Sequence, residues 1–223
     1  MDNSIAMNRN VSSDYNLKNW HLFLFITCSY LIITLVTDKF IMTRDVYQIL
    51  LSDKMESYRI DDYYEMLKRF SIYSYLAIPL ITWLKITFIA LLIQTPIMLK
   101  NIEVSFKEMF KIAAIAHIPF IVLGIARIVI LFLTPKGNYT NELFSFTPGS
   151  ITNLLRRENY SEAAYSFLSN INIYEALWIL LIYLGIKRLK KIERLDALII
   201  TSGVWLGLTA LQFGLILYLN KAL

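Results

Sequence analysis

The chain has 223 residues, of which 57% are hydrophobic and only 17% are charged, against about 25% charged in an average soluble domain. This composition excludes an ordinary soluble domain and is typical of a polytopic membrane protein. The formal net charge of +5 does not indicate nucleic-acid binding, because the basic residues lie beside apolar runs, as topology signals do. The single cysteine, Cys28, excludes an internal disulfide and is expected to be a small buried hydrophobe.

Five apolar runs have about the 20 residues that a helix needs to cross a hydrocarbon core of about 30 Å. They comprise residues 20–37, 72–99, 109–134, 171–189 and 195–219. None of them alternates in polarity, as the strands of a membrane β-barrel would. The sequence therefore predicts an all-α polytopic membrane helix bundle, with one transmembrane domain of five helices over residues 20–219.

The segments between and beyond these runs complete the predicted topology. The first run is not a secretory signal, because about twenty polar residues precede it and "LVTDKF" after it lacks a cleavage site. We expect a short cytoplasmic tail over residues 1–19, outer loops over residues 38–71 and 135–170, and a short outer tail over residues 220–223.

Basic residues gather in two short connections, one after the second run and one after the fourth. These connections carry Lys100, Lys107 and Lys111, and Lys187, Arg188, Lys190, Lys191 and Arg194. Because cytoplasmic loops carry the excess of Lys and Arg, we expect the N-terminus inside and the C-terminus outside. The outer loop 38–71 also holds six basic residues, but seven acidic residues neutralise them. Abundant Ile, Lys, Asn and Tyr are typical of an AT-rich bacterial genome, which suggests a bacterial cytoplasmic (inner) membrane.

Both outer loops carry helical signals. The first loop has an apolar stripe at positions i, i+3, i+4 and i+7, formed by Tyr63, Met66, Leu67 and Phe70. This predicts an amphipathic helix capped by Asp61 or Asp62. A second stripe comprises Val46, Ile49 and Leu50, and turn signals in the second loop flank a short helix near residues 151–157. Packing on the outer face of the bundle is the favoured interpretation, and docking of a partner is the alternative.

No motif indicates catalysis, a metal or a cofactor. His21 and His117 are the only histidines, and they lie in separate runs. Metal-ligand spacings, glycine-rich nucleotide loops and the GxSxG nucleophile elbow are all missing from the sequence. The acidic group Asp61, Asp62 and Glu65 is expected to be the solvated face of a helix. We therefore expect a non-enzymatic protein with no catalytic residues, no metal site and no cofactor.

Three charged residues interrupt the apolar runs. At about 1.5 Å per residue, Lys85, Arg127 and Glu175 lie about 17 to 22 Å from the cytoplasmic ends of their helices. Because charge at such depth is costly, we expect Lys85 and Arg127 to face the bundle interior with Glu175 close enough to neutralise one of them. Snorkelling of the two cations to the outer surface is the competing interpretation.

A second polar layer lies about 8 Å from the cytoplasmic ends and contains Gln94 and His117. Nearby prolines, Pro79, Pro96 and Pro119, lack an amide proton. We expect them to kink their helices and to free backbone carbonyls that neighbouring polar groups or water then bond.

From about residue 72 onward the chain resembles the Yip-domain family. The residues that carry the likeness are "SFKEMFKIAAIAHIPFIV", "NINIYEALWILLIYLGIKRL" and the basic hairpin leading into "ALIITSGVWLGLTAL", with Pro119, Asn172, Trp178, Gly185 and Trp205 at matching positions. The resemblance implies a five-span membrane protein, here a divergent bacterial member. The N-terminal tail lacks the acidic and aromatic motif of the eukaryotic members, so their association with Rab-type GTPases is not carried over.

Three classes of function remain open. A protein that scaffolds or modulates a membrane partner complex, or forms a homo-oligomer, agrees with the lack of chemical motifs and is the favoured reading. A small permease or permease subunit could use the charges at Lys85, Arg127 and Glu175, although no inverted repeat is visible. An intramembrane enzyme ranks third.

Overall fold

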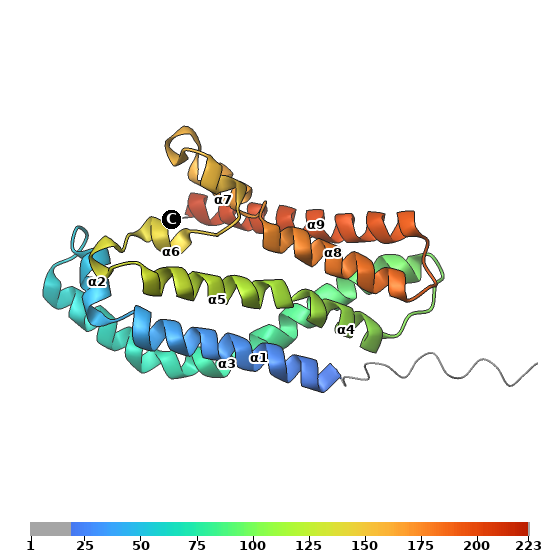
Figure 1. Ribbon diagram of the computed structural model, residues 1–223, viewed down its shortest axis with the longest axis horizontal. Helices are drawn as coiled ribbons and strands as arrows, with labels where there is room; N and C mark the ends of the chain where they lie inside the picture. Colours follow the sequence, from blue (N-terminus) through green and yellow to red (C-terminus); the bar gives the residue numbers. More distant parts are fainter. Residues whose placement is uncertain (1–18, 223) are drawn as a thin grey trace, which may run out of the picture.

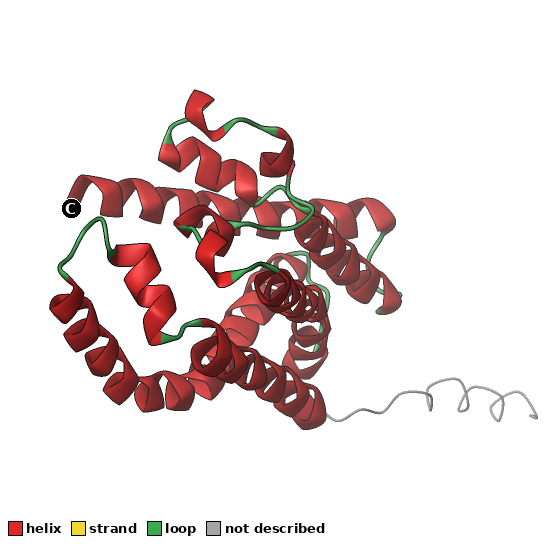
Figure 2. Cartoon of the chain, turned by 60° about the vertical axis from the view of Figure 1, so that its left-hand side comes forward, coloured by secondary structure: helices red, strands yellow, loops and turns green. Residues whose placement is uncertain are grey.

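The computed structural model describes residues 19–222, which are helical and contain no strand (Figure 2). The main helices are α1 (Asn19–Val36), α2 (Arg44–Leu51), α3 (Ser57–Leu99), α4 (Phe106–Ala116), α5 (Ile118–Leu133), α6 (Asn141–Ser145), α7 (Glu162–Ser169), α8 (Ile173–Arg188) and α9 (Arg194–Ala222). Shorter pieces are η1 (Thr37–Ile41), η2 (Lys136–Asn138), η3 (Ile151–Leu154) and η4 (Arg157–Asn159). The all-α prediction is confirmed, whereas the predicted tail over residues 1–19 lies outside the described residues except for Asn19.

Four segments are long and apolar enough to cross a membrane. They are α1 with η1 (Asn19–Ile41), α3, α4 with α5 (Phe106–Leu133), and most of α9 (Arg194–Tyr218). These helices are those of a membrane-embedded protein. The predicted fourth span, residues 171–189, is shorter than expected, because α8 has 16 residues and extends only about 24 Å. The helix begins after its N-cap residue Asn172 and ends before Lys190, which has a left-handed backbone conformation (φ 54°).

The long helices lie side by side along the longest axis of the molecule (Figure 1). One end holds the connections α3–α4 and α8–α9, and the other end holds α2 and α6 (Figure 1). Helix α4 lies at the centre of the packing and contacts α1, α3 and α8. Its residues Ala113, Ala114 and Ala116 are fully buried, and such small side chains let neighbouring helices approach closely.

Helix α3 differs from the prediction because one helix of 43 residues replaces an outer-loop helix and a separate span. It extends about 64 Å, twice the thickness of a hydrocarbon core, so its first part projects beyond a bilayer. The N-cap is Glu56 rather than Asp61 or Asp62. Although α3 contains Pro79 and Pro96, it stays helical throughout and curves along its length (Figure 1).

The projecting part of α3 packs against α2. Arg44 forms an ion pair with Asp61, and Gln48 Nε2 donates a hydrogen bond of 2.8 Å to the same carboxylate. Val46 is fully buried, as its place in the predicted stripe requires, but Ile49 of the same stripe is exposed. The other predicted stripe, on α3, is also exposed at Tyr63, Met66 and Phe70, because α2 covers mainly a neighbouring face of α3.

The predicted third span, residues 109–134, is divided at Pro119. Helix α4 ends at Ala116, His117 forms the junction, and α5 begins at Ile118 with Pro119 in its first turn. Proline is well tolerated there, because the first amide groups of a helix have no partner within the helix. The predicted kink is therefore confirmed at Pro119.

Candidate functional site

The basic connections predicted to share a side do lie at one end of the bundle. Lys100, at the end of α3, forms an ion pair with Asp196 of α9. Lys191 Nζ, in the α8–α9 connection, donates a hydrogen bond of 2.9 Å to the Glu103 carbonyl of the α3–α4 connection. We call this end, formed by residues 100–105 and 189–194, the basic end. The two contacts join connections about 90 positions apart in the sequence.

Lys85 lies on the surface of α3 and not in the interior of the bundle. Within residues 19–222 it forms no ion pair. The expectation that it faces inward is wrong, because its neighbours Ile86, Ile89 and Ala90 occupy the inward side of the helix. The exposed position of Lys85 leaves snorkelling to the outer membrane surface as the remaining prediction.

Arg127 lies half-buried on α5 and is bonded by the outer loop. Its Nη2 donates a hydrogen bond of 2.7 Å to Thr147 Oγ1. Thr147 is buried, and its carbonyl accepts a hydrogen bond of 2.9 Å from Asn153 Nδ2. Arg127 Nε is buried without a hydrogen-bond partner among the described residues. The outer loop therefore folds back over the end of α5 and supplies a neutral partner for the cation.

Glu175 lies in the first turn of α8 and forms no ion pair among the described residues. Its amide N–H donates to Asn172 Oδ1 at 2.9 Å. Its carboxyl group lies near the Trp205 indole of α9, but the indole N–H does not reach hydrogen-bond geometry. A carboxylate in the first turn is favoured by the partial positive charge of the helix N-terminus. This local effect, and not an ion pair with a cation, accompanies Glu175 in the structure.

The three intramembrane charges are thus not joined. No ion pair links Lys85, Arg127 or Glu175 in the part of the chain that the structure describes. The position of each residue along its helix gives its depth in the membrane. Whether the three charged groups come into contact depends also on the direction in which each side chain points.

The second polar layer bonds backbone carbonyls. His117 is 4% exposed, and its Nδ1 lies 2.8 Å from the Ala113 carbonyl at the end of α4. Gln94 Nε2 donates to the Val104 carbonyl in the α3–α4 connection at 3.4 Å. The His117 contact agrees with the expected bonding of a free carbonyl near the break at Pro119, whereas Gln94 bonds a loop carbonyl that no proline frees.

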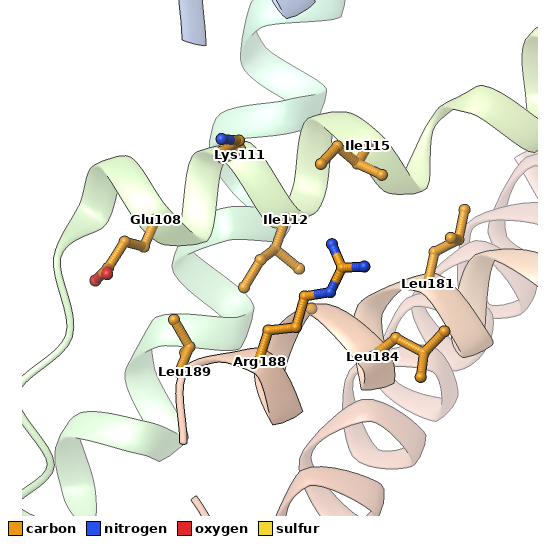
Figure 3. Close-up of a pocket in the computed structure, with 9 residues that line it drawn as sticks. Glu108, Lys111, Ile112, Ile115, Leu181, Leu184, Arg188 and Leu189 are labelled. Atoms are coloured by element: carbon orange, nitrogen blue, oxygen red, sulfur yellow. The ribbon is translucent and has the colours of Figure 1, made fainter. Parts of the chain in front are cut away.

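A pocket lies between α4 and α8 at the basic end. The sequence did not predict it. It has a volume of about 270 Å³. Its lining is Glu108, Lys111, Ile112, Ile115, Leu181, Leu184, Gly185, Arg188 and Leu189 (Figure 3). The signals in the sequence were Lys111 within α4, Arg188 at the end of α8, and a glycine, Gly185, one turn before Arg188. The described residues include no group of three or more His, Cys, Asp or Glu side chains placed to hold a metal ion.

Comparison with known proteins gives no relative. No protein-family model matches the chain, and no curated protein or solved structure matches it significantly. The resemblance to the Yip-domain family therefore stays a prediction from the sequence.

Substitutions that remove the charge of Glu175 or Lys85 test whether these side chains interact with one another. We expect Lys85→Met, at an exposed position, to change the stability of the detergent-solubilised protein by no more than about 0.5 kcal/mol. Glu175→Gln, at a half-buried helix start, should lower it by no more than about 1 kcal/mol, the usual contribution of a carboxylate at a helix N-terminus. Thermal unfolding measures both. If Glu175→Gln destabilises the protein and Lys85→Met or Arg127→Met then restores it, the charges interact after all.

Proposed function

We propose that this protein is a non-enzymatic integral membrane protein that scaffolds or modulates a membrane partner complex. The observation that carries the proposal is the exposed stripe on the projecting part of α3. Tyr63, Met66 and Phe70 are 37%, 46% and 58% exposed, and α3 is too long for a bilayer to cover all of it. Exposed aromatic and methionine side chains of this kind are enriched at protein interfaces.

The polar groups inside the bundle also favour a scaffold. Arg127 is bonded by a loop hydroxyl, and His117 and Gln94 bond backbone carbonyls. Side chains engaged in this way stabilise connections between helices. They do not form a continuous series of charges such as a transport path would use.

Co-purification tests the proposed scaffold. The full chain, extracted in mild detergent, should bring down a reproducible membrane partner, and Met66→Ser with Phe70→Ser should reduce the yield of that partner severalfold. Tyr58→Ser is the matched control, because Tyr58 is 59% exposed on the same helix but lies about a third of a turn away from the stripe. Absence of a partner, or equal loss in the control, would contradict the proposal.

We propose further that α8 makes a fifth crossing, with the N-terminus in the cytoplasm of a bacterial inner membrane. In support, α8 runs antiparallel to α9 (Figure 1), and the basic connections share one end. A short span is accommodated by local thinning of the bilayer and by snorkelling of flanking cations such as Lys187. The likeness to the Yip-domain family, of which we propose the chain as a divergent bacterial member, implies the same five spans.

Reporter fusions test this topology. A reporter active only in the cytoplasm should be inactive when fused after Leu223 and active when fused before Met1. Activity at both ends would mean an even number of crossings, with α8 lying at one surface. Activity at the C-terminus alone would mean the reverse orientation.

A permease, or a subunit of one, is the second candidate. The favouring observation is Arg127, whose half-buried guanidinium keeps Nε without a partner in the part of the chain that the structure describes. An unsatisfied cationic donor at this depth could bind an anion. Anion-dependent thermal stabilisation that Arg127→Met abolishes would favour the permease, whereas a stable partner complex without such an effect would favour the scaffold.

A further inference from the structure

The pocket between α4 and α8 combines an apolar wall with a cationic rim. Ile112 and Ile115 of α4 face Leu181 and Leu184 of α8 across about 270 Å³. Both helices run obliquely along the length of the bundle (Figure 1), and in a membrane-spanning bundle the wall between them extends from the head-group level into the hydrocarbon. A lipid acyl chain lies in the same direction, and hydrocarbon is the group that these side chains can solvate.

Arg188 supplies the polar part of the pocket. Its side chain extends from the last turn of α8 into the space below Ile115, with the guanidinium directed inward (Figure 3). No carboxylate lies within ion-pair distance of it among residues 19–222. Lys111 adds a second basic residue from the facing helix.

The one acidic residue of the pocket does not neutralise Arg188. Glu108 belongs to a capping box at the start of α4, in which its Oε2 accepts a hydrogen bond of 3.1 Å from the Ser105 amide. The carboxylate points away from the guanidinium (Figure 3). Arg188 therefore presents its positive charge to a ligand in the pocket.

The height of the pocket determines the class of ligand. Arg188 and Lys111 lie at the basic end, beside the connections that contain Lys100 and Lys191. In a membrane-embedded bundle the ends of the spans are level with the lipid head groups. Guanidinium groups bind phosphate oxygens in a bidentate manner, and basic pockets between membrane helices bind anionic lipid head groups.

We propose that this pocket binds an anionic phospholipid, with its phosphate on Arg188 and Lys111 and one acyl chain along the wall formed by Ile112, Ile115, Leu181 and Leu184. This inference goes beyond the scaffold proposal and does not depend on it. The bound lipid would add to the direct packing of α4 against α8, which includes the close approach of Gly185 to Ile112.

Lipid-dependent stability tests the site. The full chain, purified in a non-ionic detergent, is mixed with dioleoyl phosphatidylglycerol or with dioleoyl phosphatidylcholine, and the melting temperature is followed. A lipid that binds only the folded protein stabilises it by mass action. We expect phosphatidylglycerol to raise the melting temperature about 4 °C more than phosphatidylcholine does.

Matched variants locate the effect. Arg188→Gln should abolish the difference between the two lipids, whereas Lys187→Gln should keep it, because Lys187 carries the same charge on the adjacent exposed position outside the pocket. Leu184→Gln, at an exposed position of the apolar wall, should reduce the difference without removing a charge. Native mass spectrometry should show phosphatidylglycerol bound to the wild type and to Lys187→Gln but not to Arg188→Gln.

Three results would overturn the proposal. Equal stabilisation by both lipids would show that charge is not recognised. A full effect of glycerol 1-phosphate, which lacks acyl chains, would assign the pocket to a free phosphate compound. An equal loss in Arg188→Gln and Lys187→Gln would reduce the effect to the net charge of the basic end.

Discussion

Gly185→Ala should destabilise the protein by about 1 to 3 kcal/mol, the usual cost of overpacking a well-packed contact. A Cβ atom at Gly185 would lie 2.7 Å from Ile112 Cγ2 and 2.9 Å from its Cγ1. Ile112 is buried in the main core, and the close atoms are bonded directly to its Cβ, so a rotamer change toward the pocket or a shift of the helix is needed to relieve the contact. The added methyl group therefore separates α8 from α4, and thermal unfolding in detergent measures the loss.

Gly203→Ala is the matched control. Gly203 lies inside α9, and a Cβ atom there would meet no other atom within 4 Å. Because alanine is favoured over glycine within helices by about 1 kcal/mol, this variant should be neutral or slightly more stable. The two substitutions are chemically identical, so opposite effects isolate the helix contact. Equal effects would mean that α4 and α8 do not approach closely at Gly185.

Local signals account for the parts of the fold that the sequence predicted. Pro119 lacks an amide proton, and a helix interrupted there follows from that chemistry alone. The grouping of Lys and Arg in two connections predicted a common end, and the contacts of Lys100 with Asp196 and of Lys191 with Glu103 join them there. Composition and run length were sufficient for an all-α membrane bundle.

Whether a residue in a span faces lipid or another helix was not predictable from local signals. Cys28, expected to be buried, is exposed at the surface of α1. An apolar position in a membrane span can face lipid as well as protein, because both exclude water. The same ambiguity affected Lys85, because the sequence indicated its position along the span but not that its side chain points away from the bundle.

The continuous helix α3 was missed for another reason. Charged and aromatic residues before residue 72 indicated a separate outer helix, but no glycine or proline lies between Ser57 and Ala77 to end it. A change of polarity marks where a helix leaves the membrane, and only a helix-breaking residue or a cap marks where it ends. The pocket at the basic end could not be predicted either, because α4 and α8 meet only in the folded chain.

Asn172→Ala should be the second strongly destabilising change, by about 2 kcal/mol, the upper range for loss of an N-cap. Asn172 Oδ1 accepts hydrogen bonds from the amides of Tyr174 and Glu175 at 3.0 and 2.9 Å, and its Nδ2 donates to the Ser169 carbonyl at 3.0 Å. The substitution removes the acceptor of the two amides at a half-buried helix start, whereas the Ser169 carbonyl still accepts a hydrogen bond of 3.3 Å from Ser150 Oγ. Thermal unfolding in detergent is the measurement.

Replacing Asn172 by aspartate as well as by alanine separates the contribution of the N-cap acceptor Oδ1 from that of the donor Nδ2. Asn172→Asp keeps an oxygen acceptor for the two amides and loses only the donor to Ser169, so it should recover more than half of the stability lost in Asn172→Ala. Asn159→Ala, at an exposed position of the same outer loop, should be neutral. If the aspartate variant is as unstable as the alanine variant, the bond to Ser169 holds this region together and the cap contributes little. In that case the start of α8 is determined by the outer loop, which also contacts it through the Ser150–Asn172 bridge.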